Sequence, residues 1–303
     1  LEVLNCSDNG LTSLDVSNIT TLTSLNCSNN QLEVLNVQNG NNTLFSSFSA
    51  SNNPNLYCIL VDDANYSTNN WTNIDSQTLF SETDCYSKLT SKVFFQGPYD
   101  PNTGLMKDDL RSNGLIPLIS PYEDALTIEQ SVLEVTGLDA IIDWIWIELR
   151  DGADNTTAVA SRSALLQADG DIAEIDGVSL LVFDSLPVGN YYLMISHRNH
   201  IGALTSSTIG LTNLIMNADI ASDSALVTGG TNGIADMGDG SFALFSGDFS
   251  GDGQIQNTDK IAVEPLRGLS GYNNADIDMN GEVQNTDVNN ALNPNIGRGQ
   301  QLA

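Results

Sequence analysis

The sequence predicts a mainly β protein built from three successive segments, residues 1–88, 91–217 and 218–303. Three observations support this prediction. Apolar residues recur about every 21 positions near the N-terminus, and seven short runs of alternating apolar and polar residues follow. Two acidic, glycine-containing loops of twelve residues then lie near the C-terminus. The middle segment contains no helical pattern of useful length, so we expect strands and turns to form most of the fold.

The first segment repeats a short apolar pattern up to about residue 60. Each full copy has Leu or Phe at its first and fourth positions and ends in asparagine, and the copies are Leu1–Asn9, Leu22–Asn30 and Phe45–Asn53. This pattern resembles the leucine-rich repeat in a short bacterial form. The resemblance implies the end of a solenoid, in which each coil must stack on its neighbours to bury its apolar face. We expect Asn9, Asn30 and Asn53 to bond the backbone as a ladder at the bend.

All four cysteines lie in the first 85 residues. Cys6 and Cys27 occupy equivalent repeat positions, so we expect them to be small core residues. Cys58 and Cys85 flank a polar stretch after the repeats, and we predict a disulfide between them that closes a C-terminal cap of the solenoid. Such a disulfide would indicate an oxidising compartment.

The middle segment, 91–217, alternates apolar and polar residues between clusters of Gly, Pro, Asn and Asp. Seven short strands at this spacing predict an antiparallel β-sandwich of immunoglobulin-like type. Within one run we expect Ile145, Ile147 and Leu149 to point into the core, opposite Trp144 and Trp146. The predicted strands are Lys92–Gln96, Val132–Thr136, Asp143–Arg150, Ala158–Ala168, Leu180–Asp184, Asn190–His197 and Ala203–Leu211.

The third segment, 218–303, begins with a glycine-rich strand region (229–245) and then contains one loop pattern twice. The copies, Asp248–Asp259 and Asp276–Asp287, both end in Gln-Asn-Thr-Asp. Oxygen ligands at loop positions 1, 3, 5 and 12, with glycine at position 6, give the spacing that a hard cation needs. The alternative interpretation is a pair of acidic turns that bind nothing.

We predict two calcium ions, one in each loop, because several flexible oxygen ligands suit Ca²⁺ better than Mg²⁺. The ion's role would be structural, since an acidic segment repels itself until cations neutralise it. The predicted ligands of the first loop are Asp248, Ser250, Asp252, the backbone carbonyl of Gln254, Gln256 directly or through a water, and Asp259. Those of the second loop are Asp276, Asp278, Asn280, the backbone carbonyl of Glu282, Gln284 and Asp287.

The paired loops resemble dockerin and other EF-hand-like calcium modules, in which a short helix follows each loop. Aspartate at position 12, in place of the glutamate of the standard EF-hand, is shared with dockerin-type loops. The resemblance implies helices at Ile261–Leu269 and Val288–Leu292, followed by a polar tail that runs to residue 303.

The formal charge of −28 comes from 38 acidic and 10 basic residues. Such a surface repels phosphate backbones, so we expect no nucleic-acid partner. No apolar run approaches the roughly 18 residues of a membrane helix. Strong acidity with abundant Asn, Ser, Thr and Gly is typical of a secreted protein exposed to divalent cations, although net charge also serves solubility. The sequence begins inside a repeat, and we therefore expect a C-terminal piece of a longer or processed protein.

Two further groups of residues could carry chemistry. The motif His197-Arg198-Asn199-His200 has the spacing of a metal or catalytic pair, but we favour a hydrogen-bonded turn within the sandwich. Acid pairs could suggest the carboxylates of a glycosidase, although they are unavoidable in so acidic a chain. These pairs are Asp62-Asp63, Asp108-Asp109 and Glu123-Asp124.

The order of repeats, sandwich and calcium module resembles secreted or cell-surface proteins of Bacteroidota, which typically leave through type IX secretion. The expected function is non-catalytic adhesion, with a protein or glycan ligand on the repeat surface. The C-terminal part would serve as stalk, anchor or export module facing the outer-membrane secretion machinery. One alternative is a calcium-dependent assembly module that docks a cohesin-like partner. Another is a fragment of a polysaccharide-active enzyme.

Overall fold

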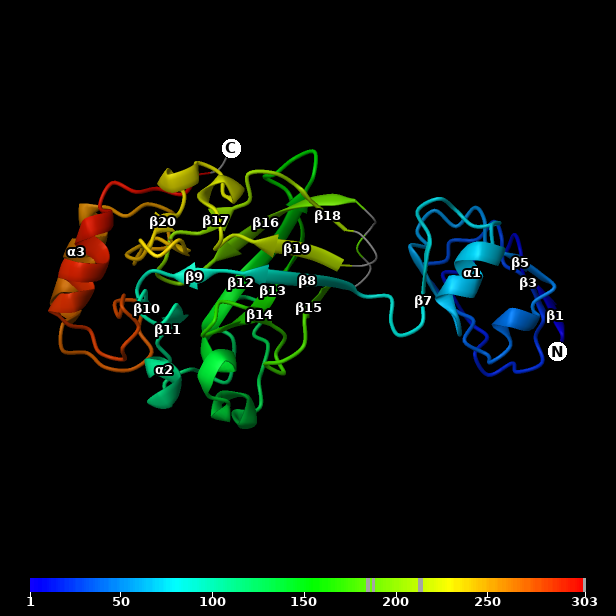
Figure 1. Ribbon diagram of the computed structural model, residues 1–303, viewed down its shortest axis with the longest axis horizontal. Helices are drawn as coiled ribbons and strands as arrows, with labels where there is room; N and C mark the ends of the chain where they lie inside the picture. Colours follow the sequence, from blue (N-terminus) through cyan, green and yellow to red (C-terminus); the bar gives the residue numbers. More distant parts are fainter. Residues whose placement is uncertain (184–185, 187–188, 212–214, 302–303) are drawn as a thin grey trace. The chain divides into compact units, whose positions relative to one another are not determined.

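The computed structural model describes residues 1–183, 186, 189–211 and 215–301. Strands and turns form most of these residues, which confirms the mainly β prediction. The chain divides into two compact units (Figure 1). Unit 1 comprises Leu1–Ser87, Phe183–Gly189 and Leu211–Ile215, and unit 2 comprises Lys88–Val182, Asn190–Gly210 and Met216–Ala303. Among the described helices, none is long and apolar enough to cross a membrane.

Unit 1 lays its repeat copies on one another as two sheets of short parallel strands. The strand orders are β1-β3-β5 and β2-β4-β6-β7. The register follows the repeat, because Leu4 pairs with Leu25 and Leu25 pairs with Phe48. The elements are β1 (Val3–Asn5), β2 (Ser13–Asp15), β3 (Ser24–Asn26), β4 (Val34–Asn36), η1 (Asn42–Leu44), β5 (Ser47–Ser49), β6 (Cys58–Leu60), α1 (Ala64–Asn70) and β7 (Leu79–Ser81).

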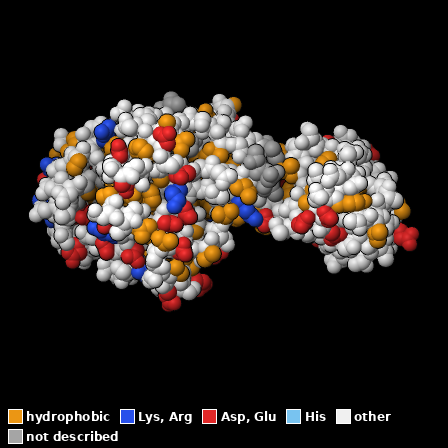
Figure 2. Space-filling view, in the orientation of Figure 1, with side chains coloured by type: hydrophobic (Ala, Val, Ile, Leu, Met, Phe, Trp, Pro, Cys, Tyr) orange, Lys and Arg blue, Asp and Glu red, His pale blue; other side chains and the backbone are white. Residues whose placement is uncertain are grey.

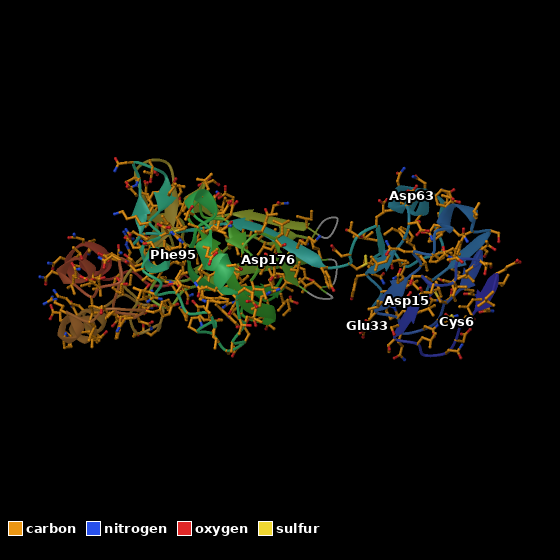
Figure 3. The ribbon with its side chains drawn as sticks, turned by 90° about the horizontal axis from the view of Figure 1, so that it is seen from below. Cys6, Asp15, Glu33, Asp63, Phe95 and Asp176 are labelled. Atoms are coloured by element: carbon orange, nitrogen blue, oxygen red, sulfur yellow. A yellow bond between two sulfur atoms is a disulfide. The ribbon has the colours of Figure 1, made fainter. Side chains whose placement is uncertain are left out.

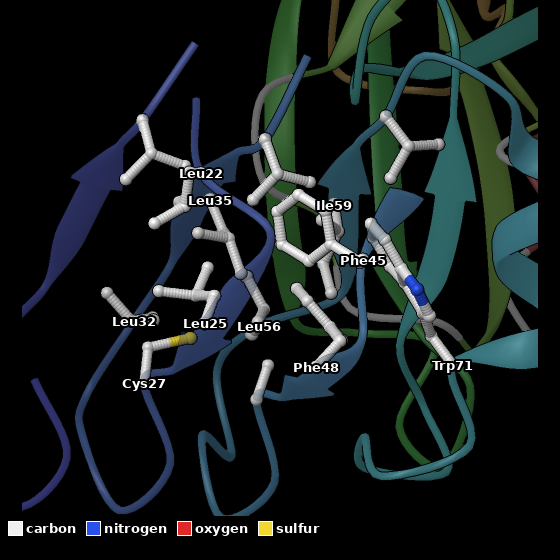
Figure 4. Packing of buried hydrophobic residues seen from close by; sticks show 14 residues of the cluster. Leu22, Leu25, Cys27, Leu32, Leu35, Phe45, Phe48, Leu56, Ile59 and Trp71 are labelled. Carbon is white, nitrogen blue, oxygen red and sulfur yellow. The ribbon is translucent and has the colours of Figure 1, made fainter. Parts of the chain in front are cut away.

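The apolar positions of successive repeats fill the interior of unit 1 (Figure 4). Leu25 and Leu35 are fully buried, and the ring of Phe48 stacks on Trp71 with 4.1 Å between centroids. Cys27 is buried as predicted, and burial raises the pKa of its thiol to about 12. Cys6 is only partly buried. Cys27 therefore acts as a small apolar core residue.

The predicted asparagine ladder is present. The side-chain amide of Asn30 donates to the carbonyls of Cys6 and Cys27, both at 3.0 Å, and its Oδ1 accepts from the backbone N–H of Asn9 at 3.0 Å. Asn53 repeats the pattern one coil further on, with a bond of 3.2 Å to the carbonyl of Cys27. Asn30 and Asn53 thus satisfy backbone groups of two repeat copies at once, whereas Asn9 donates to Cys6 and Ser7 of its own copy.

We expect Asn30→Ala to lower the free energy of unfolding of unit 1 by about 1–3 kcal/mol, because buried backbone groups lose their partners. Native-state hydrogen exchange of the unit 1 amides measures this loss. The neighbouring Gln31 is exposed, so Gln31→Ala should change the same quantity by less than about 0.5 kcal/mol. Equal effects of the two substitutions would contradict the ladder's role.

The cap of unit 1 is closed by the predicted disulfide. Cys58 and Cys85 are bonded, with their Cα atoms 5.6 Å apart, and the bond joins β6 to the segment that follows β7. Asp63, marked in Figure 3, begins α1 by accepting a bond of 2.7 Å from the backbone N–H of Tyr66. This N-cap explains why a helix forms in a polar stretch of weak helix formers.

Unit 2 is organised around a long antiparallel sheet with the order β14-β13-β12-β16-β17, on which β18 also pairs with β16. Smaller sheets have the orders β15-β8-β19, β20-β21-β9 and β10-β11. Ile145, Ile147 and Leu149 are fully buried, as predicted. The strands are β8 (Ser87–Lys92), β9 (Phe94–Phe95), β10 (Tyr99–Asp100), β11 (Leu105–Met106), β12 (Ile141–Asp151), β13 (Ala158–Gln167), β14 (Ile172–Ala173), β15 (Leu181–Phe183), β16 (Asn190–Ser196), β17 (Ala203–Leu204), β18 (Ile209–Gly210), β19 (Ile215–Asp219), β20 (Ala235–Asp236) and β21 (Phe242–Leu244).

Short helical turns connect these strands. They are α2 (Asp109–Ser112), η2 (Gln130–Glu134), η3 (Gly137–Asp139), η4 (Ser224–Leu226), η5 (Gly230–Asn232), α3 (Asn257–Val263), η6 (Glu264–Leu266), η7 (Asp287–Leu292) and η8 (Asn293–Asn295).

Three sequence predictions for unit 2 need correction. The strand predicted at Val132–Thr136 is wrong, because Gln130–Glu134 form the 3₁₀ turn η2, in which Val132 and Leu133 are both buried. The run Ala203–Leu211 forms two separate strands, β17 and β18. Trp144, predicted on the face opposite the core residues, is itself fully buried. Its burial is possible because Nε1 has a partner, the carbonyl of Pro117. Asp184, at the end of another predicted strand, lies outside the described residues.

The predicted third segment, 218–303, shares unit 2 with the middle segment. The reason is main-chain pairing across the predicted boundary. Strand β21 pairs in parallel with β9, with Leu244 opposite Phe95, and the N–H of Ile220 donates to the carbonyl of Lys92 at 3.1 Å. These pairs tie the glycine-rich region to the start of the middle segment.

Candidate metal centre

The two acidic loops share several internal hydrogen bonds. In each, the aspartate at position 1 accepts from the N–H of the position 6 glycine, Asp248 from Gly253 at 2.9 Å and Asp276 from Gly281 at 2.8 Å. Both glycines have positive φ, 80° and 91°, which explains why glycine stands there. A helical turn follows each loop, α3 after the first and η7 after the second. Both begin earlier than predicted, at Asn257 and Asp287, because the loop's last residues already form the first turn.

In the first loop, Asp248 and Asp259 are buried and aim inward from its two ends. The carboxylate of Asp259 accepts from the backbone N–H groups of Ser250 at 3.0 Å and Gln256 at 2.8 Å. The same aspartate lies in the first turn of α3, where a carboxylate stabilises a helix N-terminus. Asp252 is exposed and caps the turn at Gln254.

The second loop brings three carboxylates together. Asp276 and Asp287 are fully buried, and one oxygen from each of Asp276, Asp278 and Asp287 lies within 4.8 Å of the others. Among the residues that the structure describes, these three carboxylates are the group of His, Cys, Asp or Glu side chains that lie close enough together to hold a metal ion. The first loop carries Ser250 at position 3, where the second carries Asp278. It therefore lacks the carboxylate that completes the group in the second loop.

One ligand oxygen of the second loop has no well-aligned hydrogen-bond donor among the described residues. Oδ1 of Asp278 is buried and has no hydrogen-bond partner in good geometry, and neither has the buried hydroxyl of Thr286, the residue before Asp287. This hydroxyl lies near enough to oppose the rise in the pKa of Asp278, but it does not neutralise the charge of the carboxylate. A buried carboxylate oxygen without a donor is costly unless a cation faces it. The residues of this loop therefore fit a bound Ca²⁺ ion.

The remaining predicted ligands surround the buried carboxylates from the outside. Asn280 is half-buried and accepts from the N–H of Glu282 at 2.9 Å, and the side chain of Gln284 donates to the carboxylate of Glu282. Gln254 and Gln256 of the first loop are exposed. Solvent-facing groups at positions 7 and 9 are placed as in loops that complete the shell with a carbonyl and a water.

Burial raises the pKa of Asp248 to about 6 and that of Asp276 to about 7, and neighbouring carboxylates add to both shifts. Burial also raises the pKa of Asp278 to about 6. Because the folded pKa values exceed the unfolded ones, the ion-free protein loses stability as the pH rises from about 4 to 7. Protons therefore compete with a cation for these loops below about pH 7.

We expect calcium to bind roughly tenfold or more tightly at pH 8 than at pH 5.5, with release of protons at the lower pH. Isothermal titration calorimetry in two buffers of different ionisation heat measures both quantities. Equal affinities at the two pH values, with no proton release, would show that these carboxylates are not the ligands.

A buried polar cluster centred on Asp143, here called the Asp143 hub, lies at the end of the long sheet. The carboxylate of Asp143 accepts from Arg198 Nε at 3.0 Å and from the hydroxyl of Tyr272 at 2.7 Å, and it lies 3.2 Å from His197 Nε2. Burial alone would raise the pKa of Asp143, but Arg198 and His197 hold it below its ordinary value.

The two histidines are part of this hub rather than an exposed metal pair. Their Nδ1 atoms lie 3.0 Å apart, and burial lowers the pKa of His200 well below its ordinary value. Phe95, marked in Figure 3, lies 4.1 Å from the His197 ring and 4.7 Å from the His200 ring. The predicted turn is hydrogen-bonded, but its partners extend beyond the middle segment to residues 272–276. Arg198, for example, donates to the carbonyl of Asn273 at 2.6 Å.

Asp143 and Tyr272 are members of this cluster that were not predicted. A usable signal was present, since Asp143 is the only charged residue in the apolar run from Ala140 to Ile147. A charge in so apolar a run must be paired when it is buried. Nothing in the local sequence indicates Tyr272, which lies 129 positions further along the chain.

No protein-family model matches the chain, and no curated protein matches it. Two solved structures, both type II cohesin–X-dockerin complexes from Acetivibrio cellulolyticus, align with 71% of the chain at 11% identity. The complex with a mutated C-terminal interface has a TM-score of 0.38 and is covered over 97% of its chain. The complex with a mutated N-terminal interface has a TM-score of 0.33 and is covered over 96%. Scores this low carry no argument, so function is argued from the chain's own loops.

Proposed function

We propose that this chain is a calcium-stabilised, non-catalytic binding protein of the cell surface or the extracellular space. The observation that carries this proposal is the convergence of Asp276, Asp278 and Asp287 around one point, with a buried Asp278 oxygen that has no well-aligned hydrogen-bond donor among the described residues. Bound Ca²⁺ would supply the positive charge that buried carboxylates of one sign need. The chain's own residues hold those carboxylates in place through backbone N–H groups.

We further propose that unit 1 is the end of a leucine-rich-repeat solenoid and presents the recognition surface. The parallel strand register, the apolar interior and the asparagine ladder support this proposal. Val3 on β1 and Val34 on β4 are 62% and 53% exposed, so these strands offer apolar side chains to a protein or glycan ligand. We likewise propose that unit 2 contains an immunoglobulin-like sandwich. The long antiparallel sheet and the smaller sheets of this unit support the proposal.

The disulfide between Cys58 and Cys85 supports an oxidising, extracellular location. On the face shown in Figure 2, acidic side chains are scattered over both units rather than gathered in one patch. This distribution favours general exposure to cations over a single basic partner. Export by type IX secretion, and contact with outer-membrane secretion machinery, remain proposals that rest on the resemblance alone.

The acid pairs that could suggest a glycosidase have structural partners, which supports a non-catalytic role. Asp63 caps α1. Asp108 accepts from Arg111 Nε at 2.8 Å, and Asp124 accepts from the N–H of Ser163 at 2.7 Å. One acid of each pair is therefore engaged in holding the fold.

A docking role is the second candidate, and one observation favours it. Ile261 on α3 and Leu269 after η6 are 67% and 46% exposed, which leaves apolar side chains on the surface next to the first loop. A partner of the cohesin type could cover them.

Binding of the full chain to glycan and protein arrays in 2 mM calcium, on the order of extracellular levels, separates these functions. Val34→Asp and Ile261→Asp change exposed apolar residues in unit 1 and unit 2. Recognition by the repeats predicts that Val34→Asp abolishes binding while Ile261→Asp preserves it, and docking predicts the reverse. Glycan cleavage that is lost on substitution of a single carboxylate would overturn the non-catalytic proposal.

A further inference from the structure

Asn199 lies between the entrances of the two acidic loops. Its backbone carbonyl accepts from the N–H of Gly247 at 3.0 Å, directly before position 1 of the first loop. Its side-chain amide donates to the carbonyl of Asp276, position 1 of the second loop, at 2.8 Å, and to the carbonyl of Asn274 at 3.2 Å. One residue thus contacts the backbone at both entrances.

The environment of Asn199 makes it a rigid connection. The residue is fully buried, and its Oδ1 lies 2.8 Å from His200 Nδ1. The preceding Arg198 binds Asp143 and the carbonyl of Asn273, just ahead of the second loop. The Asp143 hub therefore holds the Asn199 side chain in one orientation.

The loops have no main-chain connection at position 8, where paired calcium loops could join as strands. Ile255 of the first loop exchanges bonds with the C-terminal tail, its N–H donating to Arg298 at 2.9 Å and its carbonyl accepting from Gly297 at 2.8 Å. Val283 of the second loop bonds Leu269 instead, at 2.8 Å. Among the described residues, the two side chains share only an apolar cluster.

We propose that Asn199 is a positioning residue that couples the two calcium loops. The inference rests on the proposed calcium binding and names how the two sites communicate. Ordering of position 1 in one loop holds Asn199, which then lowers the ordering cost of position 1 in the other. Groups that hydrogen-bond the metal-binding residues without touching the metal typically change metal affinity about 10–100-fold when they are removed. Coupling between sites is reciprocal and typically amounts to about 5–150-fold.

The test is a double-mutant cycle on the full chain, stripped of calcium and titrated by nuclear magnetic resonance. The amide signals of Gly253 and Gly281, the position 6 glycines, report the two loops separately. Asp278→Ala disables the second loop by removing a ligand. We expect it to weaken calcium binding at Gly253 by about fivefold or more. In the Asn199→Ala background, the same substitution should change the Gly253 midpoint by less than about twofold.

Gln167→Ala is the matched control. Gln167 has a buried side-chain amide in the same unit, and its Nε2 donates to the carbonyl of Gly177. Neither residue belongs to either of the two acidic loops. The cycle in this background should keep the full coupling. Coupling that survives Asn199→Ala, or that Gln167→Ala abolishes equally, would overturn the proposal.

The wild-type arm keeps the test decisive even if Asn199→Ala does not fold. If Asp278→Ala leaves the Gly253 midpoint unchanged in the otherwise native chain, the loops are uncoupled and the inference is wrong. If neither glycine signal responds to calcium in the native chain, the proposed calcium binding itself fails, which is a different result.

Discussion

Removal of calcium is expected to lower the melting temperature of unit 2 by roughly 10–30 °C. At a free calcium concentration a thousand times the dissociation constant, each occupied loop adds about 4 kcal/mol of stability. A domain of this size shifts by about 2–4 °C for each kcal/mol. The buried carboxylates Asp276 and Asp287 make the ion-free state costly, since burial and the neighbouring carboxylates outweigh the attraction of Arg198 for Asp276.

Differential scanning calorimetry in calcium and in excess EDTA measures this effect. Unit 1 carries no part of either loop, so the hydrogen exchange of its amides should be unchanged by EDTA. Readdition of calcium should restore the original melting temperature. An unchanged melting temperature in EDTA would contradict a structural role for the ion.

Asp143→Asn should lower the free energy of unfolding of unit 2 by about 3–5 kcal/mol, and its melting temperature by about 10 °C. The substitution keeps the size of the side chain but leaves the buried Arg198 without its counter-charge. Arg198 is also stacked on Tyr272, with 4.3 Å between the guanidinium carbon and the ring centroid, so it cannot turn to water without losing that contact. Urea unfolding followed by tryptophan fluorescence reports the change, because Trp144 adjoins Asp143.

Asp171→Asn is the matched control for charge removal. Asp171 pairs with Lys92 at 3.1 Å, but both side chains are substantially exposed, and such pairs contribute about 0–1 kcal/mol. If Asp143→Asn costs no more than Asp171→Asn, the hub does not stabilise unit 2 as described here.

Local patterns predicted those parts of the fold that depend on neighbours in sequence. The repeat period placed the parallel strands of unit 1, and the ladder asparagines end each copy because a buried bend needs their amides. Alternation placed β12 and β13. It failed at Val132 and Leu133, where two adjacent apolar residues pack from a single turn.

Long-range pairing could not be predicted in the same way. The parallel pairing of β9 with β21 joins residues about 150 positions apart. The two strands have only two and three residues, and neither has a distinctive sequence pattern. This pairing helps to place residues 218–303 in the same unit as the strands of the middle segment. The acidic loops are visible in the sequence because the ligands of each lie within twelve residues. The contacts of Asn199 with both entrances are long-range, and its local sequence predicts only a turn.

Native mass spectrometry of the calcium-loaded full chain tests the central claim most directly. Paired calcium loops predict two Ca²⁺ ions for each chain, one ion in Asp278→Ala, and none after EDTA. Binding of no ion by the native chain, or of two ions by Asp278→Ala, would contradict the assignment of these loops as the calcium sites.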